Sequence, residues 1–138
     1  MDEGWHEDQY LIMFSGDEIE AATNRYNCQK YLPGYEVVGL AGWDDLLVRD
    51  STGETYSVPA VPLVQERVAK WSFPCTPDAL QPDEKFTGKI KWYLTPIVFG
   101  GDPEASDNLA WLTHEQHGEA MTWWNEKFLD VKASQTTK

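Results

Sequence analysis

The sequence predicts an α+β fold: a β-meander against which the other segments pack, with an amphipathic helix at the C-terminus. Three strand-length segments rich in Val, Leu and Tyr follow one another between Tyr31 and Leu63, separated by Gly, Pro, Asp or Ser clusters. Two other segments carry the residue spacing that begins helices. A chain of 138 residues is the size of one domain and can bury a core without metals or disulfides. We therefore expect residues 1–138 to form a single domain.

The first strand and the first helix are expected before the central segments. Tyr10–Phe14 is a continuous apolar run of strand length, which suits a strand covered on both faces. Ser15 stands three residues before Glu18, the spacing of a capping box, so a helix is predicted over about 16–26. Its buried face is expected to carry Ile19, Ala22 and Tyr26.

The central segments predict a β-meander that the other elements pack against. Pro33-Gly34 leads into it, Gly42 lies in its first turn, and Asp50–Gly53 forms its second turn. The expected strands are Tyr35–Leu40, Leu46–Arg49 and Glu54–Val58.

The segment after the meander is less regular. Val64–Trp71 has helical composition and predicts a short helix, whereas three prolines exclude regular structure from most of the next dozen residues. These prolines are Pro74, Pro77 and Pro82. Strand character returns over Lys89–Phe99, where Pro96 is expected at an edge position or a bulge.

The last helix is the best marked of the chain. Thr113 and Gln116 repeat the capping spacing and predict a helix over His114–Leu129. One continuous stripe is expected to face the core, with Trp123 beside it. The stripe consists of His117, Met121, Trp124 and Phe128. Residues 130–138 are polar and are expected to form a frayed tail.

Charge is the most unusual bulk property of the chain. Asp and Glu number 23 against 11 Lys and Arg, which gives a net charge of −12, and the first twenty residues hold seven acids with no Lys or Arg. Such a surface repels phosphate backbones and attracts basic partners, so we expect no direct nucleic-acid binding. An acidic surface that serves solubility alone is the alternative. The absence of a long apolar run or a basic signal segment predicts a cytoplasmic protein without membrane contact.

The chemistry-bearing residues form no recognisable catalytic or metal motif. Cys28 and Cys75 lack CxxC spacing and are expected to be reduced packing residues. His114 and His117 lie one residue short of the HExxH spacing, and the only other histidine is His6. We therefore expect no metal or cofactor and partial burial of His117. The lack of nucleophile, phosphate-loop and dinucleotide motifs favours a protein that is not an enzyme.

Trp43, Asp44 and Asp45 lie in a turn of the meander and are the leading candidates for a functional site. Glycoside hydrolysis needs two carboxylates from different elements, whereas adjacent strand residues point to opposite faces. A turn cap with an exposed acid, or an acidic and aromatic contact patch for a partner, therefore fits these residues better. Two of the seven tryptophans are expected near the surface and three in the core. The former are Trp5 and Trp43, and the latter are Trp92, Trp111 and Trp124.

Residues 10–128 carry a set of loosely spaced segments in a recognisable order. They are the strand and Ser of Tyr10–Ser15, the acidic helix Glu18–Tyr26, the Tyr31-Leu-Pro-Gly entry, a strand closing on Gly39, the acid and strand Asp45–Val48, the Val58-Pro59 and Pro62-Leu63 exit, Ala69–Phe73, and the C-terminal block Tyr93–Phe128. In these segments the chain resembles proteins of the SUKH superfamily, which includes a fungal cell-wall-assembly regulator and many bacterial immunity proteins.

The resemblance implies an α+β domain with a curved, mostly antiparallel sheet flanked by helices. It further implies a non-enzymatic role in the cytosol: binding a cognate toxin of a bacterial secreted toxin system, such as a nuclease, and blocking its active site or substrate channel. An acidic protein suits the basic substrate groove of such a toxin. The expected contact residues are Trp43, Asp44 and Asp45, supported by Trp5, Glu7 and Asp8. A regulatory scaffold that binds a cellular protein, and a small-ligand or carbohydrate-binding domain, are the alternatives.

Overall fold

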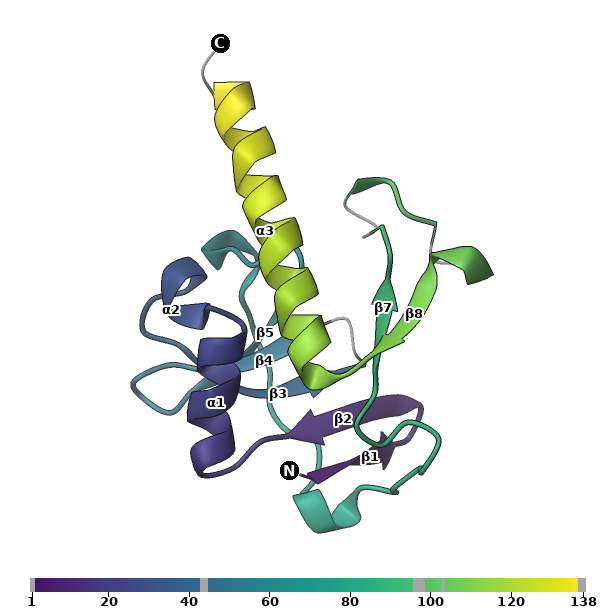
Figure 1. Cartoon of the computed structure of the whole chain (residues 1–138). Helices are drawn as coiled ribbons and strands as arrows, with labels where there is room; N and C mark the ends of the chain where they lie inside the picture. The colour runs from purple at the N-terminus through teal and green to yellow at the C-terminus, as the bar shows by residue number, and fades with distance from the viewer. Residues whose placement is uncertain (1, 43–44, 96–98, 103, 137–138) are drawn as a thin grey trace.

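A computed structural model describes residues 2–42, 45–95, 99–102 and 104–136 and confirms the predicted α+β fold (Figure 1). Its six-stranded sheet follows chain order from β1 to β6, and every neighbouring pair is antiparallel. The strands are β1 (Asp2–His6), β2 (Gln9–Met13), β3 (Glu36–Ala41), β4 (Asp45–Arg49), β5 (Thr55–Pro59) and β6 (Ala69–Lys70). A second sheet has two strands, β7 (Ile90–Tyr93) and β8 (Leu109–Leu112).

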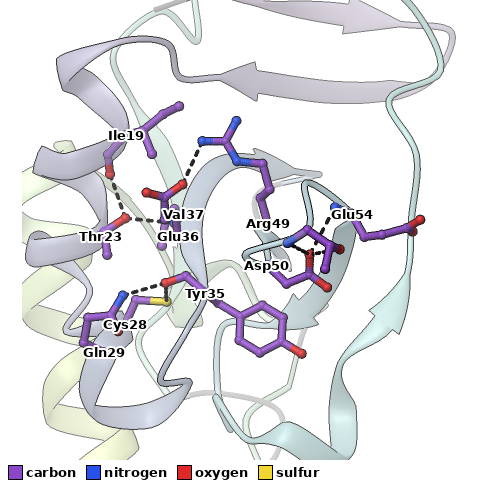
Figure 2. A network of polar contacts seen from close by, with 11 residues as sticks. Ile19, Thr23, Cys28, Gln29, Tyr35, Glu36, Val37, Arg49, Asp50 and Glu54 are labelled. Atoms are coloured by element: carbon purple, nitrogen blue, oxygen red, sulfur yellow. Dashed lines mark hydrogen bonds and ion pairs between the residues drawn. The ribbon is translucent and has the colours of Figure 1, made fainter.

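The predicted meander is confirmed as β3, β4 and β5, each within one residue of its expected start. One carboxylate organises the β4–β5 turn: Asp50 Oδ1 accepts hydrogen bonds from the backbone N–H of Thr52 at 2.9 Å and of Glu54 at 3.1 Å (Figure 2). Tyr56 donates its hydroxyl to the other oxygen at 2.8 Å. The Asp50 carboxylate therefore makes its hydrogen bonds within this turn and the strand that follows it.

Strand β1 was not predicted, because its sequence is acidic and has little apolar alternation. Backbone pairing holds it on both sides: it pairs with β2 along its whole length, and Trp5 exchanges two hydrogen bonds of 2.8 and 2.9 Å with Gln81. At Gly4 a Cβ atom would lie 2.6 Å from the Gln81 carbonyl oxygen. Glycine at this position therefore permits the close approach of the two backbones.

Both faces of the sheet are covered, as the apolar run Tyr10–Phe14 predicts. The side chains of Tyr10 and Ile12 face the helices, whereas Leu11 and Met13 belong to a separate core cluster. That second cluster is closed by the proline-rich segment 71–80, whose residues Trp71, Phe73, Cys75 and Leu80 pack there. The irregular segment therefore serves as the cover of one sheet face.

Helix α1 (Asp17–Arg25) and the short α2 (Cys28–Tyr31) lie against β3. The backbone N–H of Ser15 donates to Glu18, so half of the predicted capping box forms. Figure 2 shows how α1 is attached: the Thr23 hydroxyl donates to the Ile19 carbonyl at 2.7 Å and accepts the Val37 N–H at 2.9 Å. The predicted buried face is confirmed, with Ala22 and Tyr26 fully buried and Ile19 partly buried.

The helix predicted over Val64–Trp71 is wrong. This segment forms a single 3-10 turn (Gln65–Arg67) followed by β6, which pairs with the outer edge of β5. Pairing supplies hydrogen-bond partners to the edge of β5, and this outweighs a weak helical propensity. Trp71 then packs edge-on against Phe73, with ring centroids 4.8 Å apart.

The strand predicted over Lys89–Phe99 is shorter than expected and ends at Tyr93. Its partner β8 begins within a segment that carried no strand prediction. Asn108 joins the two sides of the hairpin at its loop end, because its amide accepts the Thr95 N–H at 2.7 Å and donates to the Thr95 carbonyl at 3.0 Å. Pro96, predicted at an edge or bulge, lies outside the described residues.

Helix α3 (His114–Thr136) begins with a complete capping box, since Thr113 and Gln116 each donate a backbone N–H to the other's side chain, at 3.0 and 3.2 Å. His117 and Met121 of the predicted stripe are fully buried, and Trp124 and Phe128 are half-buried. The helix continues beyond Leu129 to Thr136, where a frayed tail was expected. No glycine or proline follows Gly118 to end it.

Candidate partner-binding surfaces

Acids from two turns lie at one end of the six-stranded sheet. Because β2 and β3 are antiparallel, the β1–β2 turn lies at the same end as the β3–β4 connection, and the Gly42 N–H donates to the Tyr10 carbonyl at 2.8 Å. Glu7 and Asp8 are exposed in the first turn, and Asp45 is half-buried at the start of β4. We call Glu7, Asp8 and Asp45 the acidic sheet end.

The structure places the remaining predicted contact residues differently. Trp43 and Asp44 lie outside the described residues. Trp5 was expected near the surface, but it is half-buried and packs edge-on against Tyr10 at 5.3 Å and Phe86 at 5.8 Å between ring centroids. Its indole N–H donates to Asp83 Oδ2 at 3.1 Å. Trp5 therefore fixes the β1 edge, and a direct contact with a partner stays a prediction.

Two tryptophans that were not predicted at the surface are exposed. Trp111, predicted in the core, is 45% exposed, because it pairs with Lys91 on the outer face of the β7–β8 hairpin. Trp92, on the inner face, is 8% exposed as predicted. Trp123 on α3 is 60% exposed. The alternation of β7 could have identified the outward side of the hairpin, whereas nothing local marks Trp123.

A groove of about 620 Å³ runs between α1 and α3. The two helices approach closely at Gly118, where a Cβ atom would collide with Arg25 Cγ and lie 2.9 Å from the Arg25 carbonyl oxygen. We call the lining residues the α1–α3 groove. They are Arg25, which is the last residue of α1, Asn27 just after that helix, and Glu115, Gly118, Glu119, Thr122, Trp123 and Glu126 of α3.

The α3 wall of the groove has an ordered arrangement of charge. Glu115, Glu119 and Trp123 are spaced four residues apart, so their side chains follow one another along one side of the helix. Glu126 closes the far end by accepting hydrogen bonds from Lys30 Nζ at 2.7 Å and the Tyr31 hydroxyl at 2.6 Å. The hydrogen bonds from Lys30 and Tyr31 lower the pKa of Glu126, so this carboxylate stays ionised, and Lys30 is its counter-ion.

A second pocket of about 470 Å³ adjoins the groove at the start of α3, and Arg25 lines both. Phe14 and Glu18 form part of its wall, opposite His114. Both ring nitrogens of His114 and Nη1 of Arg25 are buried without a hydrogen-bond partner among the described residues. Burial, followed by the positive charge of Arg25, lowers the pKa of His114. Positive charge is therefore disfavoured beside His114, at the start of α3.

His117 is fully buried rather than partly buried. It shares a hydrogen bond of 2.8 Å between Nδ1 and the Tyr26 hydroxyl, and its ring meets the rings of Tyr26 and Trp92 nearly at right angles. Burial lowers the pKa of His117 to about 3, with smaller contributions from His114 and Arg25. His117 is therefore a neutral core residue at physiological pH.

The described residues contain no group of three His, Cys, Asp or Glu side chains that could hold a metal ion. Cys28 is buried and Cys75 half-buried, both as free thiols, and burial raises the pKa of Cys28 to about 11. A thiol of that pKa is protonated at neutral pH and a poor nucleophile. Within the described residues, no helix has the length and apolarity needed to cross a membrane.

Comparison of the chain with protein-family models, curated proteins and solved structures gives no match. The resemblance to the SUKH superfamily therefore stays an inference from the segments quoted above.

Proposed function

We propose that this protein is an immunity protein that binds and neutralises a cognate toxin acting in the bacterial cytosol, and that the toxin presents a basic surface. The net charge of −12 carries this proposal. A charge of that size in a chain of 138 residues acts on charged partners well beyond contact distance.

The physical basis is electrostatic steering. An acidic protein meets a basic one at rates far above the neutral value, and fast association suits an inhibitor that must capture a toxin before it acts. Toxins that cut nucleic acid need a basic groove for their substrate, and an acidic protein is complementary to such a groove. Glu7 and Asp8 of the acidic sheet end are exposed and available for this contact.

The resemblance to SUKH immunity proteins supports the same role and a mechanism without catalysis. Neutralisation by occupation needs only affinity and a matching surface. Two buried side chains are consistent with this role, since burial holds His117 of α3 and Cys28 of α2 in their uncharged forms. Both side chains belong to the buried core.

Co-expression tests the proposal. The protein is expressed in a bacterial host together with the toxic domain encoded beside it, and host survival and co-purification are scored. Survival together with a stable complex is expected, while an unrelated toxin domain should still kill. Death of the host and no complex would contradict the proposal. A stable complex with a host protein instead would favour a regulatory scaffold.

A further inference from the structure

We propose that the α1–α3 groove binds an arginine side chain of the basic partner, with the guanidinium stacked on Trp123 and paired with Glu119, and with Glu115 adding attraction one turn further along α3. The proposal rests on the proposed function for the identity of the partner. The chemistry of the groove is independent of the proposed function, because the exposed side chains of α3 determine it.

The first argument is the exposure of Trp123. A tryptophan that is 60% exposed leaves a large apolar face in water, which binding to a partner removes. The ring is nevertheless held: it meets Trp124 edge-to-face at 4.7 Å between centroids, and Trp124 packs against Phe99 at 4.9 Å. Trp123 is thus an exposed aromatic surface on a supported side chain.

The second argument is the charge beside it. Glu115 and Glu119 are exposed like charges four residues apart on one helix, an arrangement that destabilises an isolated helix. Glu115 lies in the first turn, where the helix dipole compensates for its charge, but Glu119 lies beyond that turn. Neither carboxylate has a hydrogen bond or ion pair in the part of the chain that the structure describes. A cation from outside would supply the missing partner.

The third argument is the shape of the groove. The floor between the two helices is closed, because the Arg25 side chain lies on Gly118 and Asn27 donates to the Thr122 hydroxyl at 2.9 Å. A side chain from a partner would lie over this floor, along the Glu119 and Trp123 side of α3. Arg25 lies on the α1 side and repels a second cation, which favours a guanidinium on the α3 side, next to Glu119 and Trp123. The paired Glu126 and Lys30 close the groove beyond Trp123.

Arginine fits this arrangement better than lysine. A guanidinium is planar and weakly hydrated, so it can stack on an indole while its N–H groups point sideways to carboxylates. An ammonium is a compact, strongly hydrated charge and makes the ion pairs but not the stacking contact. The groove is therefore expected to prefer arginine to lysine, and lysine to the neutral citrulline.

The first experiment uses the whole protein and a short oligo-arginine peptide, with the lysine and citrulline analogues as matched probes. The indole N–H resonance of Trp123 is assigned from the Trp123→Phe variant and followed during titration. A saturable shift is expected, in the order arginine, lysine, citrulline. No shift of this resonance with the arginine peptide would overturn the proposal, as would an equal shift with citrulline.

Matched variants separate the groove from general attraction. Glu115→Gln with Glu119→Gln should weaken arginine-peptide binding at Trp123 about fivefold. Glu54→Gln with Glu84→Gln removes the same charge from exposed positions elsewhere and should leave that binding nearly unchanged. Equal weakening by both pairs would mean that net charge alone acts, and would overturn the groove. A resonance that shifts with protein concentration alone would assign Trp123 to self-association instead.

The toxin complex provides the second arm. Trp123→Ala should raise the dissociation rate of the complex about tenfold, because truncating an aromatic anchor acts mainly on the lifetime of a complex. An unchanged dissociation rate would place the toxin elsewhere while the proposed function stands. A groove that binds the arginine peptide in a protein that protects from no toxin would mean that the proposed function fails and the arginine site stands.

Discussion

The acidic sheet end and the α1–α3 groove carry charge of the same sign but are built in different ways. Glu7 and Asp8 belong to a two-residue turn, and the strand hydrogen bonds on both sides of it determine where they lie. The groove depends on two helices that meet where Arg25 faces Gly118, far away in the chain. A surface made by turns is a local property of the sequence, whereas a groove is a property of packing.

This difference implies different roles toward a basic partner. Exposed turn acids act over a distance set by ionic screening, about 10 Å at moderate salt, and so affect the encounter. The groove combines two carboxylates with the Trp123 ring, which acts only at contact.

Asn125 connects the two regions, and its loss should damage both. Its amide accepts the buried Leu63 N–H at 2.7 Å and donates to the Ala60 carbonyl at 3.0 Å, just after Pro59, which pairs with Asp45. Asn125→Ala leaves a buried N–H and a buried carbonyl without this partner. The free energy of unfolding should fall by about 2–3 kcal/mol in equilibrium urea denaturation.

The control for this variant is Asn24→Ala, an exposed asparagine on α1, which should change stability by less than about 0.5 kcal/mol. If Asn125→Ala were as stable as the control, α3 would not depend on this connection, and the two regions would be mechanically independent.

A lower pH should reduce the free energy of unfolding through His117 of α3. Its pKa of about 3 in the fold lies below its ordinary value of 6.5. Between these values the unfolded chain binds a proton that the folded chain does not, so the free energy of unfolding falls as the pH falls from 6.5 toward 3. At pH 5 the loss from this group is roughly 2 kcal/mol.

The measurement is urea denaturation at pH 7.5 and pH 5 for the parent protein and for His117→Gln. Subtracting the two pH differences isolates His117, because Arg25, Tyr26 and His114 remain in both proteins. The variant should lose about 2 kcal/mol less on acidification. Equal losses in the two proteins would show that His117 is protonated without cost in the fold.

A side chain at position 118 should separate the helices and leave the sheet unchanged. Gly118→Val introduces atoms where the Arg25 side chain and carbonyl already lie. Overpacking of this kind should lower the free energy of unfolding by about 1–2 kcal/mol, part of the cost being offset by better helix propensity. The Trp123 response to the arginine peptide should weaken as well.

Ala69→Val, at an exposed strand position, is the matched control and should be within about 0.5 kcal/mol of the parent. An unchanged Trp123 response in a destabilised Gly118→Val protein would mean that the groove does not depend on the close helix approach.

The sequence predicted those parts of the fold that local chemistry determines. The three meander strands and the start of α3 were predictable, because turn residues and the Thr113 and Gln116 capping pair mark them. Strand β1 was not, because backbone pairing with β2 and Gln81 forms it rather than apolar side chains.

For the candidate sites, the shared position of Glu7 and Asp45 follows from strand register, which requires the pairing of β2 with β3 to be known. The groove was missed because Gly118 has meaning only opposite Arg25. Trp111 was misplaced because no strand was predicted around it, so its pairing with Lys91 on the outer face of the hairpin was not expected.

Charge reversal at the acidic sheet end tests the division of roles between the two surfaces. Glu7→Lys with Asp8→Lys should slow association with the basic toxin about tenfold at low salt and leave the dissociation rate nearly unchanged, whereas Trp123→Ala does the reverse. Glu54→Lys with Glu84→Lys makes the same charge change elsewhere and should slow association less. Stopped-flow mixing gives the association rate, and release of the protein from surface-bound toxin gives the dissociation rate. Both are measured at two salt concentrations. If the two charge reversals slowed association equally, the position of the turn acids would be irrelevant, and only the net charge of the protein would steer the encounter.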